Sequence, residues 1–412
     1  MNHIMNHMLI SRPGKTVKFY LTIAFLLLYT GICYAGSKPA EFAEEEKEMA
    51  VEVPKTWLEK FFKAKQDFAE KSGTDVSVLF NYQQNVLLKS KEGDGKTKAP
   101  WYANLAISQK LWPKASLVFE AEGGRGNSVD KYVPTFSILD SNAGEYSLFY
   151  VPQLYLQQNA LEDKFYFVLG RLDLSDWTDA NAVASCADTQ FQSSALVSNM
   201  AIPFPSKGIG AMAGVKPLEW AYFRYGVSNA DARSTQVRLN GLFHSIFNIS
   251  EIGFTPKIGE RQGNYRFEAA YNYKRLDRID GEGEQRHDWA FGLSFDQEVT
   301  DRTTLFFRYG FGDRRVRDIQ NFWSAGWQVC APFKKRKDDV FAAAVAQSIM
   351  GRDYLRNTEE AAKAETLFEI YYSLALNKFF TLTPNFQVVI NPGADDKAES
   401  AIACGGRLVF IF

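Results

Sequence analysis

The segment from 174 to 207 carries the side chains best suited to contact a polar solute. Its sequence, LSDWTDANAVASCADTQFQSSALVSNMAIPFPSK, contains Asp176, Trp177, Asp179 and Asp188 together with several amides. Carboxylates and amides hydrogen-bond hydroxyl groups, and an indole face packs against the apolar face of a pyranose ring. The pattern favours a sugar-binding surface. The alternative interpretation is an ordinary solvated loop.

The final segment, AIACGGRLVFIF at 401–412, indicates the kind of element that positions such a surface. Its side chains alternate, so that Arg407 lies on the face opposite Phe410 and Phe412. One face suits lipid and the other suits water, as in a strand of a membrane β-barrel, although the last strand of a soluble sandwich also alternates. A terminal Phe412 also resembles the signature that the barrel-insertion machinery of Gram-negative outer membranes reads.

The N-terminus predicts export from the cytoplasm. Three basic residues and no acid occupy 12–18, before the apolar core FYLTIAFLLLYTGIC at 19–33. We interpret 1–35 as a signal peptide that is cleaved after Ala35. The apolar run is shorter than the ~20 residues of a membrane-spanning helix, and the residues before Cys33 poorly fit a lipoprotein signal.

The composition of the remaining 377 residues is typical of a membrane barrel. Aromatic residues make up 15% of the whole chain and charged residues 23%, and the mean hydropathy is −0.25. These values are too polar for a helical membrane protein and unusually aromatic for a soluble domain. After cleavage, 44 basic and 48 acidic residues give a net charge of about −4, so we expect no nucleic-acid partner.

Period-two alternation recurs through 74–412. In NYRFEAAYNYKR at 264–275, Tyr265 and Phe267 face one way, whereas Arg266 and Glu268 face the other. We predict an all-β fold, a transmembrane antiparallel barrel of about 16 strands near 74–84, 101–110, 115–122, 146–157, 164–173, 208–215, 220–227, 247–255, 263–274, 287–297, 302–311, 322–329, 339–347, 365–376, 379–390 and 400–412. Long and short connections alternate between them, as between extracellular loops and periplasmic turns. A barrel of this size encloses an aqueous lumen.

Residues 36–73 precede the barrel. An acid-rich stretch at 41–52 is followed by Trp57, Phe61, Ala64 and Phe68, which recur at helical spacing. We predict a short amphipathic helix that packs at the periplasmic mouth of the barrel.

Three blocks of this sequence resemble the carbohydrate-selective porins of the OprB type. They are EGGRG at 122–126, GRLDLSDWTDANAVASCADTQFQSSALVSNMAIPFPSKGIGA at 170–211, and LTPNFQVVINPG at 382–393 with the GGRLVFIF end. The resemblance spans roughly 74–412. It implies a sixteen-stranded passive channel for monosaccharides in the outer membrane of a Gram-negative-type bacterium, with a constriction of arginines and carboxylates.

Matching the family's blocks to this sequence gives a set of candidate constriction residues: Glu122, Arg125, Arg171, Asp173, Asp176 and Trp177. Strand parity adds further charged residues to the lumen, namely Arg224, Arg266, Glu268 and Arg308. By analogy, the loop at 174–207 folds into the pore, and the protein forms a homotrimer. Expected partners are small sugars or other polar solutes, outer-membrane lipid and the assembly machinery that reads Phe412.

Other functions have less support in the sequence. The alternatives are a general porin without sugar selectivity and a barrel that acts as a scaffold for a partner protein. For an enzyme, the histidines His244 and His287 are far apart, and the sequence has no GxSxG turn, no complete GxxxxGK[ST] phosphate loop and no dinucleotide fingerprint. We therefore expect no catalysis, metal or cofactor. A Cys186–Cys330 disulfide is chemically possible in an oxidising compartment.

Overall fold

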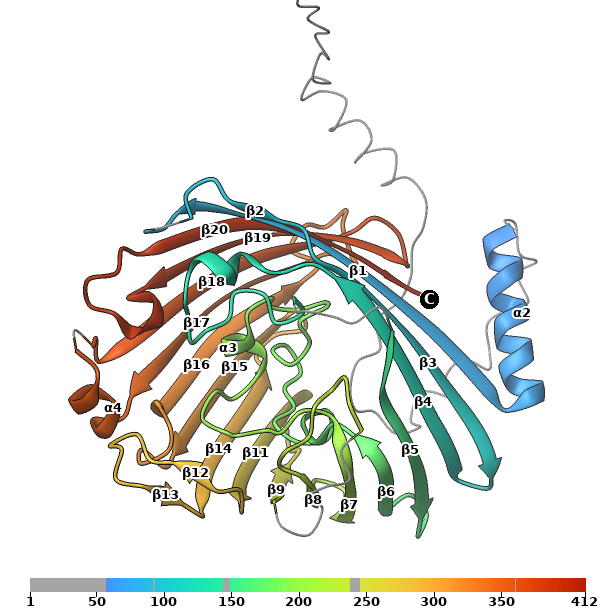
Figure 1. Ribbon diagram of the computed structural model, residues 1–412. Coiled ribbons are helices and arrows are strands. Elements are labelled where there is room, and N and C mark those ends of the chain that lie inside the picture. The colour runs from blue at the N-terminus through green and yellow to red at the C-terminus, as the bar shows by residue number, and fades with distance from the viewer. Residues whose placement is uncertain (1–56, 92, 144–148, 238–244, 360) are drawn as a thin grey trace, which may run out of the picture.

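Sixteen long antiparallel strands form one closed sheet in a computed structural model, which describes residues 57–91, 93–143, 149–237, 245–359 and 361–412 (Figure 1). The expected signal peptide, the acid-rich stretch and His244 lie outside the described residues. The long strands are β1 (Thr74–Lys89), β3 (Trp101–Trp112), β4 (Ala115–Arg125), β5 (Tyr150–Ala160), β6 (Phe165–Leu172), β7 (Gly208–Leu218), β8 (Ala221–Asn229), β9 (Ile246–Phe254), β11 (Arg261–Asn272), β14 (Asp288–Glu298), β15 (Thr303–Gly312), β16 (Ile319–Cys330), β17 (Val340–Met350), β18 (Ala364–Ala375), β19 (Phe380–Ile390) and β20 (Ala401–Ile411).

The sheet closes because β1 pairs with β3 on one side and with β20 on the other. Leu79, for example, stands opposite Asn104 and also opposite Ile411. Closure satisfies the backbone groups of every wall strand, which is the condition for a β structure in lipid. Within the described residues, no helix is both long and apolar enough to cross a bilayer.

Alternation along the strands sorts the side chains as the sequence predicts. On β11, Phe267 is 44% exposed on the outer surface, whereas Arg266 and Glu268 are buried on the lumen side. On β20, Arg407 is buried on the side opposite Leu408 and Phe410. The predicted barrel with an apolar outside and a polar inside is confirmed.

Connections at one end of the barrel are mostly long and those at the other end mostly short. Two connections depart from this alternation: 313–318 is short for the long-loop end, and 331–339 is longer than the other turns. Strand ends also differ from the prediction. β1 runs to Lys89 because its last residues pair with β20, and β7 continues to Leu218, so that the turn before β8 shortens to 219–220.

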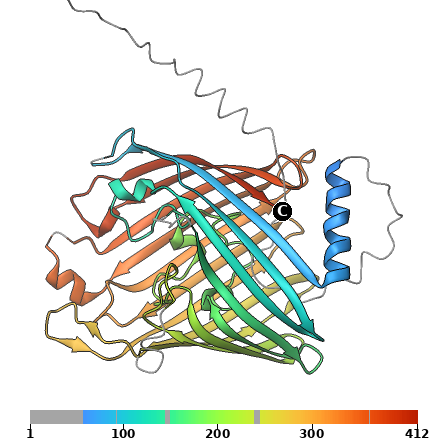
Figure 2. The same ribbon diagram turned by 45° about the vertical axis from the view of Figure 1, so that its right-hand side comes forward.

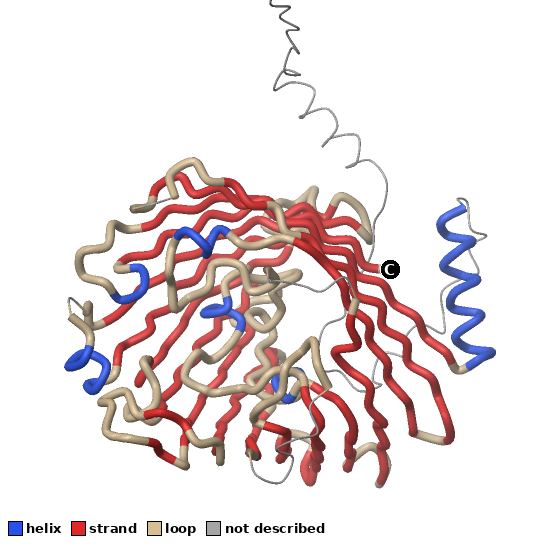
Figure 3. Tube along the Cα trace, viewed as in Figure 1, coloured by secondary structure: helices blue, strands red, loops and turns tan. Residues whose placement is uncertain are grey.

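Small elements lie in the connections, and several of them fold into the barrel (Figure 3). They are β2 (Thr97–Lys98), η2 (Val129–Tyr132), η3 (Leu174–Asp176), α3 (Ser194–Val197), β10 (Lys257–Ile258), β12 (Leu276–Asp277), β13 (Glu284–Gln285), α4 (Arg352–Asn357) and η4 (Pro392–Ala394).

Helix α2 (Trp57–Ser72) stands at the short-turn end of the barrel, beside the start of β1 (Figure 2). The ring of Phe62 stacks on Phe379, with centroids 4.1 Å apart, and Phe61 stacks on Phe412 at 5.1 Å. The helix that the sequence predicts is present, and it rests on the aromatic residues that end the barrel.

Candidate functional site

Residues 173–207, which connect β6 to β7, fold into the lumen and are called the inward loop here. They include η3 and α3, and their apolar core packs against the barrel wall. The buried ring of Phe191 meets Tyr371 at 5.0 Å and Phe306 at 5.8 Å. The loop is therefore folded and packed inside the barrel, and it is not an ordinary solvated loop.

Arg308 on β15 is fully buried, and within the described part of the chain its guanidinium makes four hydrogen bonds to the inward loop. Nε donates to Oδ1 of Asp179 at 2.7 Å, and Nη2 donates to the Asp179 carbonyl at 3.0 Å. Further bonds reach the carbonyls of Ala184 at 3.0 Å and Leu196 at 3.2 Å. One side chain thus fixes two separate stretches of the loop.

Two wall carboxylates hold the same loop from the neighbouring strands. Glu251 on β9 and Glu268 on β11 stand opposite each other, and both accept a hydrogen bond from the Asp179 main-chain N–H, at 3.1 and 2.6 Å. Both carboxylates are almost fully buried. Desolvated backbone groups require such partners, because an unpaired buried amide costs about 1–3 kcal/mol.

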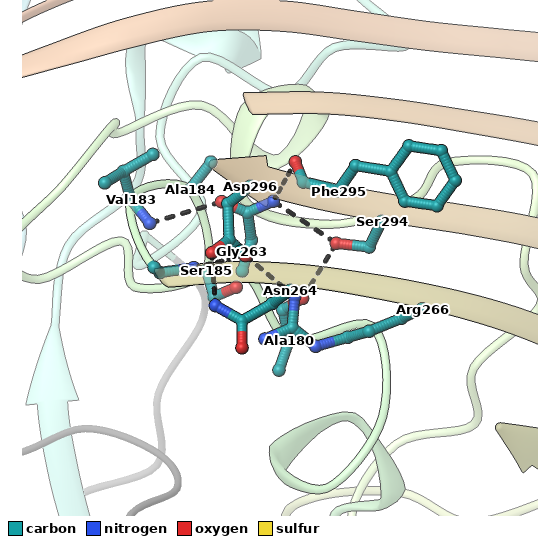
Figure 4. A network of polar contacts seen from close by, with 12 residues as sticks. Ala180, Val183, Ala184, Ser185, Gly263, Asn264, Arg266, Ser294, Phe295 and Asp296 are labelled. Carbon is teal, nitrogen blue, oxygen red and sulfur yellow. Dashed lines mark hydrogen bonds and ion pairs between the residues drawn. The ribbon is translucent and has the colours of Figure 1, made fainter. Parts of the chain in front are cut away.

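Strands β11 and β14 bind the next stretch of the loop, as Figure 4 shows. The hydroxyl of Ser294 donates to the Ala180 carbonyl at 2.7 Å, and Asp296 accepts from the Ala182 N–H at 3.2 Å. Arg266 in turn donates to Asp296 at 2.8 Å. Arg266 therefore neutralises a carboxylate that anchors the loop.

The far side of the inward loop is held by β18 and β20. Arg407 donates to the carbonyls of Ala187 and Gln190, and Glu369 accepts from the N–H groups of Gln192 and Ser193 at 2.7 and 3.0 Å. Arginines bind the loop's carbonyls and glutamates bind its amides. Each charge therefore matches the polarity of the backbone group that it meets.

The connection between β4 and β5 also folds inward and covers the inward loop. Glu365 on β18 accepts from the N–H of Phe136 at 3.0 Å and of Ser137 at 2.7 Å. Ser194 and Ala195 of the inward loop donate their N–H groups to residues of this connection, at 3.0 and 3.1 Å. These two loops fill the part of the lumen beside β14 to β20.

A second group of charged side chains, the ionic cluster, lies where both ends of the inward loop meet the wall from β4 to β9: Asp173, Asp176 and Lys207 come from the loop, and Glu120 and Glu122 come from β4. Nζ of Lys207 lies 3.5 Å from Oε2 of Glu122. The amide of Gln153 donates to Asp176 at 2.8 Å and to Glu120 at 3.3 Å. Burial alone would lower the pKa of the Lys207 ammonium, but the surrounding carboxylates outweigh it and raise that pKa.

Trp177 stands next to this ionic cluster, within a group of aromatic rings. Its ring stacks on Tyr166 with centroids 5.3 Å apart, and Tyr155 meets it edge-on at 6.3 Å. Arg224 donates to the Trp177 carbonyl at 2.5 Å and lies over the ring of Tyr222, 4.4 Å from its centroid. Among the described residues, the indole nitrogen of Trp177 has no hydrogen-bond partner.

The structure divides the predicted site residues into three groups. Five gather at the ionic cluster and the adjacent aromatic rings: Glu122, Asp173, Asp176, Trp177 and Arg224, of which Arg224 also holds the inward loop through the Trp177 carbonyl. Arg266, Glu268 and Arg308 instead hold the inward loop, either directly or through Asp296.

Two arginines join neither group. Arg171 pairs with Leu154 and Ile209 on the outward-facing side of its strand, and its guanidinium donates to the carbonyls of Arg233 and Ser234 at 3.0 and 2.5 Å. Arg125 is exposed at the end of β4, on the side opposite Glu122 by strand parity.

Sequence reasoning missed Glu120 and Lys207 of the ionic cluster. Glu120 lies two positions before Glu122 on β4, so parity alone could have placed it in the lumen. Lys207 ends a loop, where no periodicity assigns a direction to its side chain.

Cys330 is a free thiol, so the Cys186–Cys330 disulfide is not formed.

Comparisons with known proteins agree with this geometry. Residues 92–412 match the family model described as carbohydrate-selective porin, OprB family. The high-pH structure of Pseudomonas putida OprB is similar, with a TM-score of 0.78 and 15% identity, over 88% of this chain and 100% of that one. The channel DcaP of Acinetobacter baumannii has a TM-score of 0.53 at 11% identity, over 82% of this chain and 97% of that one.

A weaker sequence relative is porin AaxA of Chlamydia abortus. It is 21% identical over 222 residues, which are 53% of this chain. The match spans about half of that porin, 48% of its length.

Proposed function

We propose that this chain, which belongs to the OprB family of carbohydrate-selective porins, carries monosaccharides by passive diffusion. Porins of this family are channels of the Gram-negative outer membrane. The solute passes the place where both ends of the inward loop meet the wall from β4 to β9. The solute contacts are Glu122, Asp173, Asp176, Trp177 and Arg224.

Charges of both signs at this wall support the proposal. The carboxylates of Glu122, Asp173 and Asp176 gather around Lys207, whereas Arg224 lies beside Trp177. Groups of both charges side by side at one wall offer hydrogen-bond donors and acceptors to a polar solute and disfavour apolar ones. Arg266 and Glu268, also predicted as solute contacts, are assigned the role of loop anchors instead.

The arrangement of Trp177 carries the proposal. Its ring is fixed by stacking on Tyr166, and its carbonyl is held by Arg224. The exposed carboxylate of Asp176 precedes it directly in the chain. An aromatic face beside carboxylate and guanidinium groups matches the apolar face and the hydroxyl rim of a pyranose.

Sugar-dependent current through purified protein in a planar bilayer tests the assignment. Glucose should reduce the ionic conductance of the wild type, and the variant Trp177→Ala should lose most of this effect while it still conducts. Trp220→Ala is the matched control, because Trp220 is 51% exposed at a short turn. Liposome swelling should be faster with monosaccharides than with oligosaccharides.

The alternatives give different results in the same experiments. Conductance that no sugar changes would identify a general porin. Bilayers that stay silent, although the protein is folded, would favour a scaffold for a partner protein and refute the diffusion channel.

We also propose how the protein reaches the membrane. Residues 1–35 are removed as a signal peptide, 36–73 form the periplasmic segment and 74–412 form the barrel. The assembly machinery recognises the end at Phe412, and the product is a homotrimer. Mass spectrometry of the mature N-terminus and the mass of the detergent-extracted protein test these steps.

A further inference from the structure

The barrel leaves the apolar stripe of helix α2 largely uncovered, although Phe61 at its start contacts Phe412. The residues that are partly covered by the barrel are Phe62, Lys65 and Ala69, which recur at helical spacing along one side. The stripe that begins at Phe61 lies on the adjacent side, where Phe61 is 48% and Phe68 54% exposed. Large aromatic side chains left open on a helix indicate a partner for that face.

The contacts of Phe61 continue the lipid-facing surface of the barrel. Its ring stacks on Phe412, which follows Leu408 and Phe410 on the outward-facing side of the last strand. Lys65 lies over the same Phe412 ring at 4.6 Å. The apolar stripe of the helix therefore joins the outer surface of the barrel where that surface ends.

The C-terminal end of the helix is fixed at the level of the exposed aromatic residues of the short turns. The Gly73 carbonyl accepts from the Lys110 N–H at 2.8 Å, and the Ser72 carbonyl accepts from the Gln109 amide at 3.3 Å. Trp112, at the end of the same strand β3, is 53% exposed. Girdles of aromatic residues mark the boundary between the membrane and water in such barrels.

Gly73 sets the direction of the helix relative to β1. Its φ of +68° lies in the left-handed region, which ends helices and reverses the chain. As Figures 1 and 2 show, the helix consequently lies across the strand ends, outside the barrel outline, rather than extending β1.

We propose that α2 is an interfacial helix that binds the phospholipids of the periplasmic leaflet. Phe61 and Phe68 insert among the upper acyl chains, while the exposed ammonium groups of Lys60 and Lys71, which flank this stripe, reach the phosphates. Continuity with the lipid-facing surface favours phospholipid over a second copy of the chain or a soluble periplasmic protein.

Site-specific quenching in bilayers tests this placement. In full-length protein whose cysteines are replaced by serine, a fluorescent label is attached to Phe68→Cys or, as the matched control, to Gln66→Cys. Both positions are exposed on the same helix, but they point in nearly opposite directions. Labelled protein is reconstituted into vesicles whose phospholipids carry bromine on the acyl chains.

The fluorescence emission of the label at 68 should be blue-shifted and should be quenched by the brominated acyl chains. The emission of the label at 66 should be quenched mainly by a water-soluble quencher. Equal access of both labels to the water-soluble quencher would overturn the proposal. Energy transfer between labels on different copies, without quenching by the brominated chains, would also overturn it and identify a second copy as the partner. Heat-modifiable gel migration verifies that both variants contain a folded barrel.

Discussion

Replacing Arg308 by methionine should loosen the inward loop without unfolding the barrel. Methionine keeps much of the length of the side chain but removes the charge and all four hydrogen bonds to Asp179, Ala184 and Leu196. Asp179 then stays buried without its counter-charge. Removing one partner of a buried ion pair typically costs about 3–5 kcal/mol.

This cost falls on the docking of the loop, because strands β14 to β16 stay paired with each other. A loss of about 3–5 kcal/mol lowers the ratio of docked to undocked loop by roughly two to three and a half orders of magnitude. Arg407 and Glu369 still hold the stretch from 187 to 193. The stretch from 179 to 184 should therefore detach intermittently.

Single-channel recording measures this detachment directly. Arg308→Met should add current noise and reduce the effect of glucose, while gel migration still reports a folded barrel. The double variant Arg308→Met with Asp179→Asn should recover part of the loss, since no unpaired charge remains. Arg302→Met is the control, because Arg302 is exposed and, in the described part of the chain, its guanidinium donates to the Ala331 carbonyl at 3.4 Å. Quiet, unchanged current from Arg308→Met would refute the anchoring role.

Three further predictions concern charge, pH and assembly. Lys207→Met should raise the permeability of cations relative to anions, because it removes the ammonium among the carboxylates of Glu122, Asp173 and Asp176. The change is measured as a shift in reversal potential in a salt gradient. Lys91→Met, on an exposed loop, should leave the reversal potential unchanged. Burial, together with the neighbouring Asp130, raises the pKa of Asp140 from 3.8 to about 7, so the docked connection between β4 and β5 retains this proton more strongly than the undocked one. Docking should weaken as the pH rises from about 4 to about 7; limited proteolysis across this range should show more cleavage at higher pH, and Asp140→Asn should remove the trend. Deleting Phe412 should reduce the amount of inserted barrel, measured on outer-membrane fractions, and normal amounts with altered sugar selectivity would contradict its assignment to assembly.

The wall of the barrel was predictable because lipid and water impose opposite demands on alternate residues. Tyr265, Phe267, Arg266 and Glu268 obey this rule on β11, and the same rule locates the other strands. Strand ends were less predictable, since pairing decides them. β1 extends to Lys89 because β20 on one side and β2 on the other offer partners beyond residue 84.

The candidate site was predictable in part. The family blocks lead to Glu122, Asp173, Asp176 and Trp177, which the fold brings near one another. The same blocks include Arg171, whose side chain lies on the outward-facing side of β6. A match between segments specifies which residues occur, but the direction of each side chain depends on the register of its strand.

Parity could place Arg308 and Glu268 in the lumen, but it could not say what they meet there. A loop that folds into a pore removes its N–H and C=O groups from water, so the wall behind it must supply buried donors and acceptors. In sequence, such a wall is as polar as one that faces solvent. Glu369 and Arg407 therefore have the alternation of pore-lining residues, although their partners are backbone groups of the inward loop. Only the path of the loop separates the residues that select the solute from those that hold the loop in place.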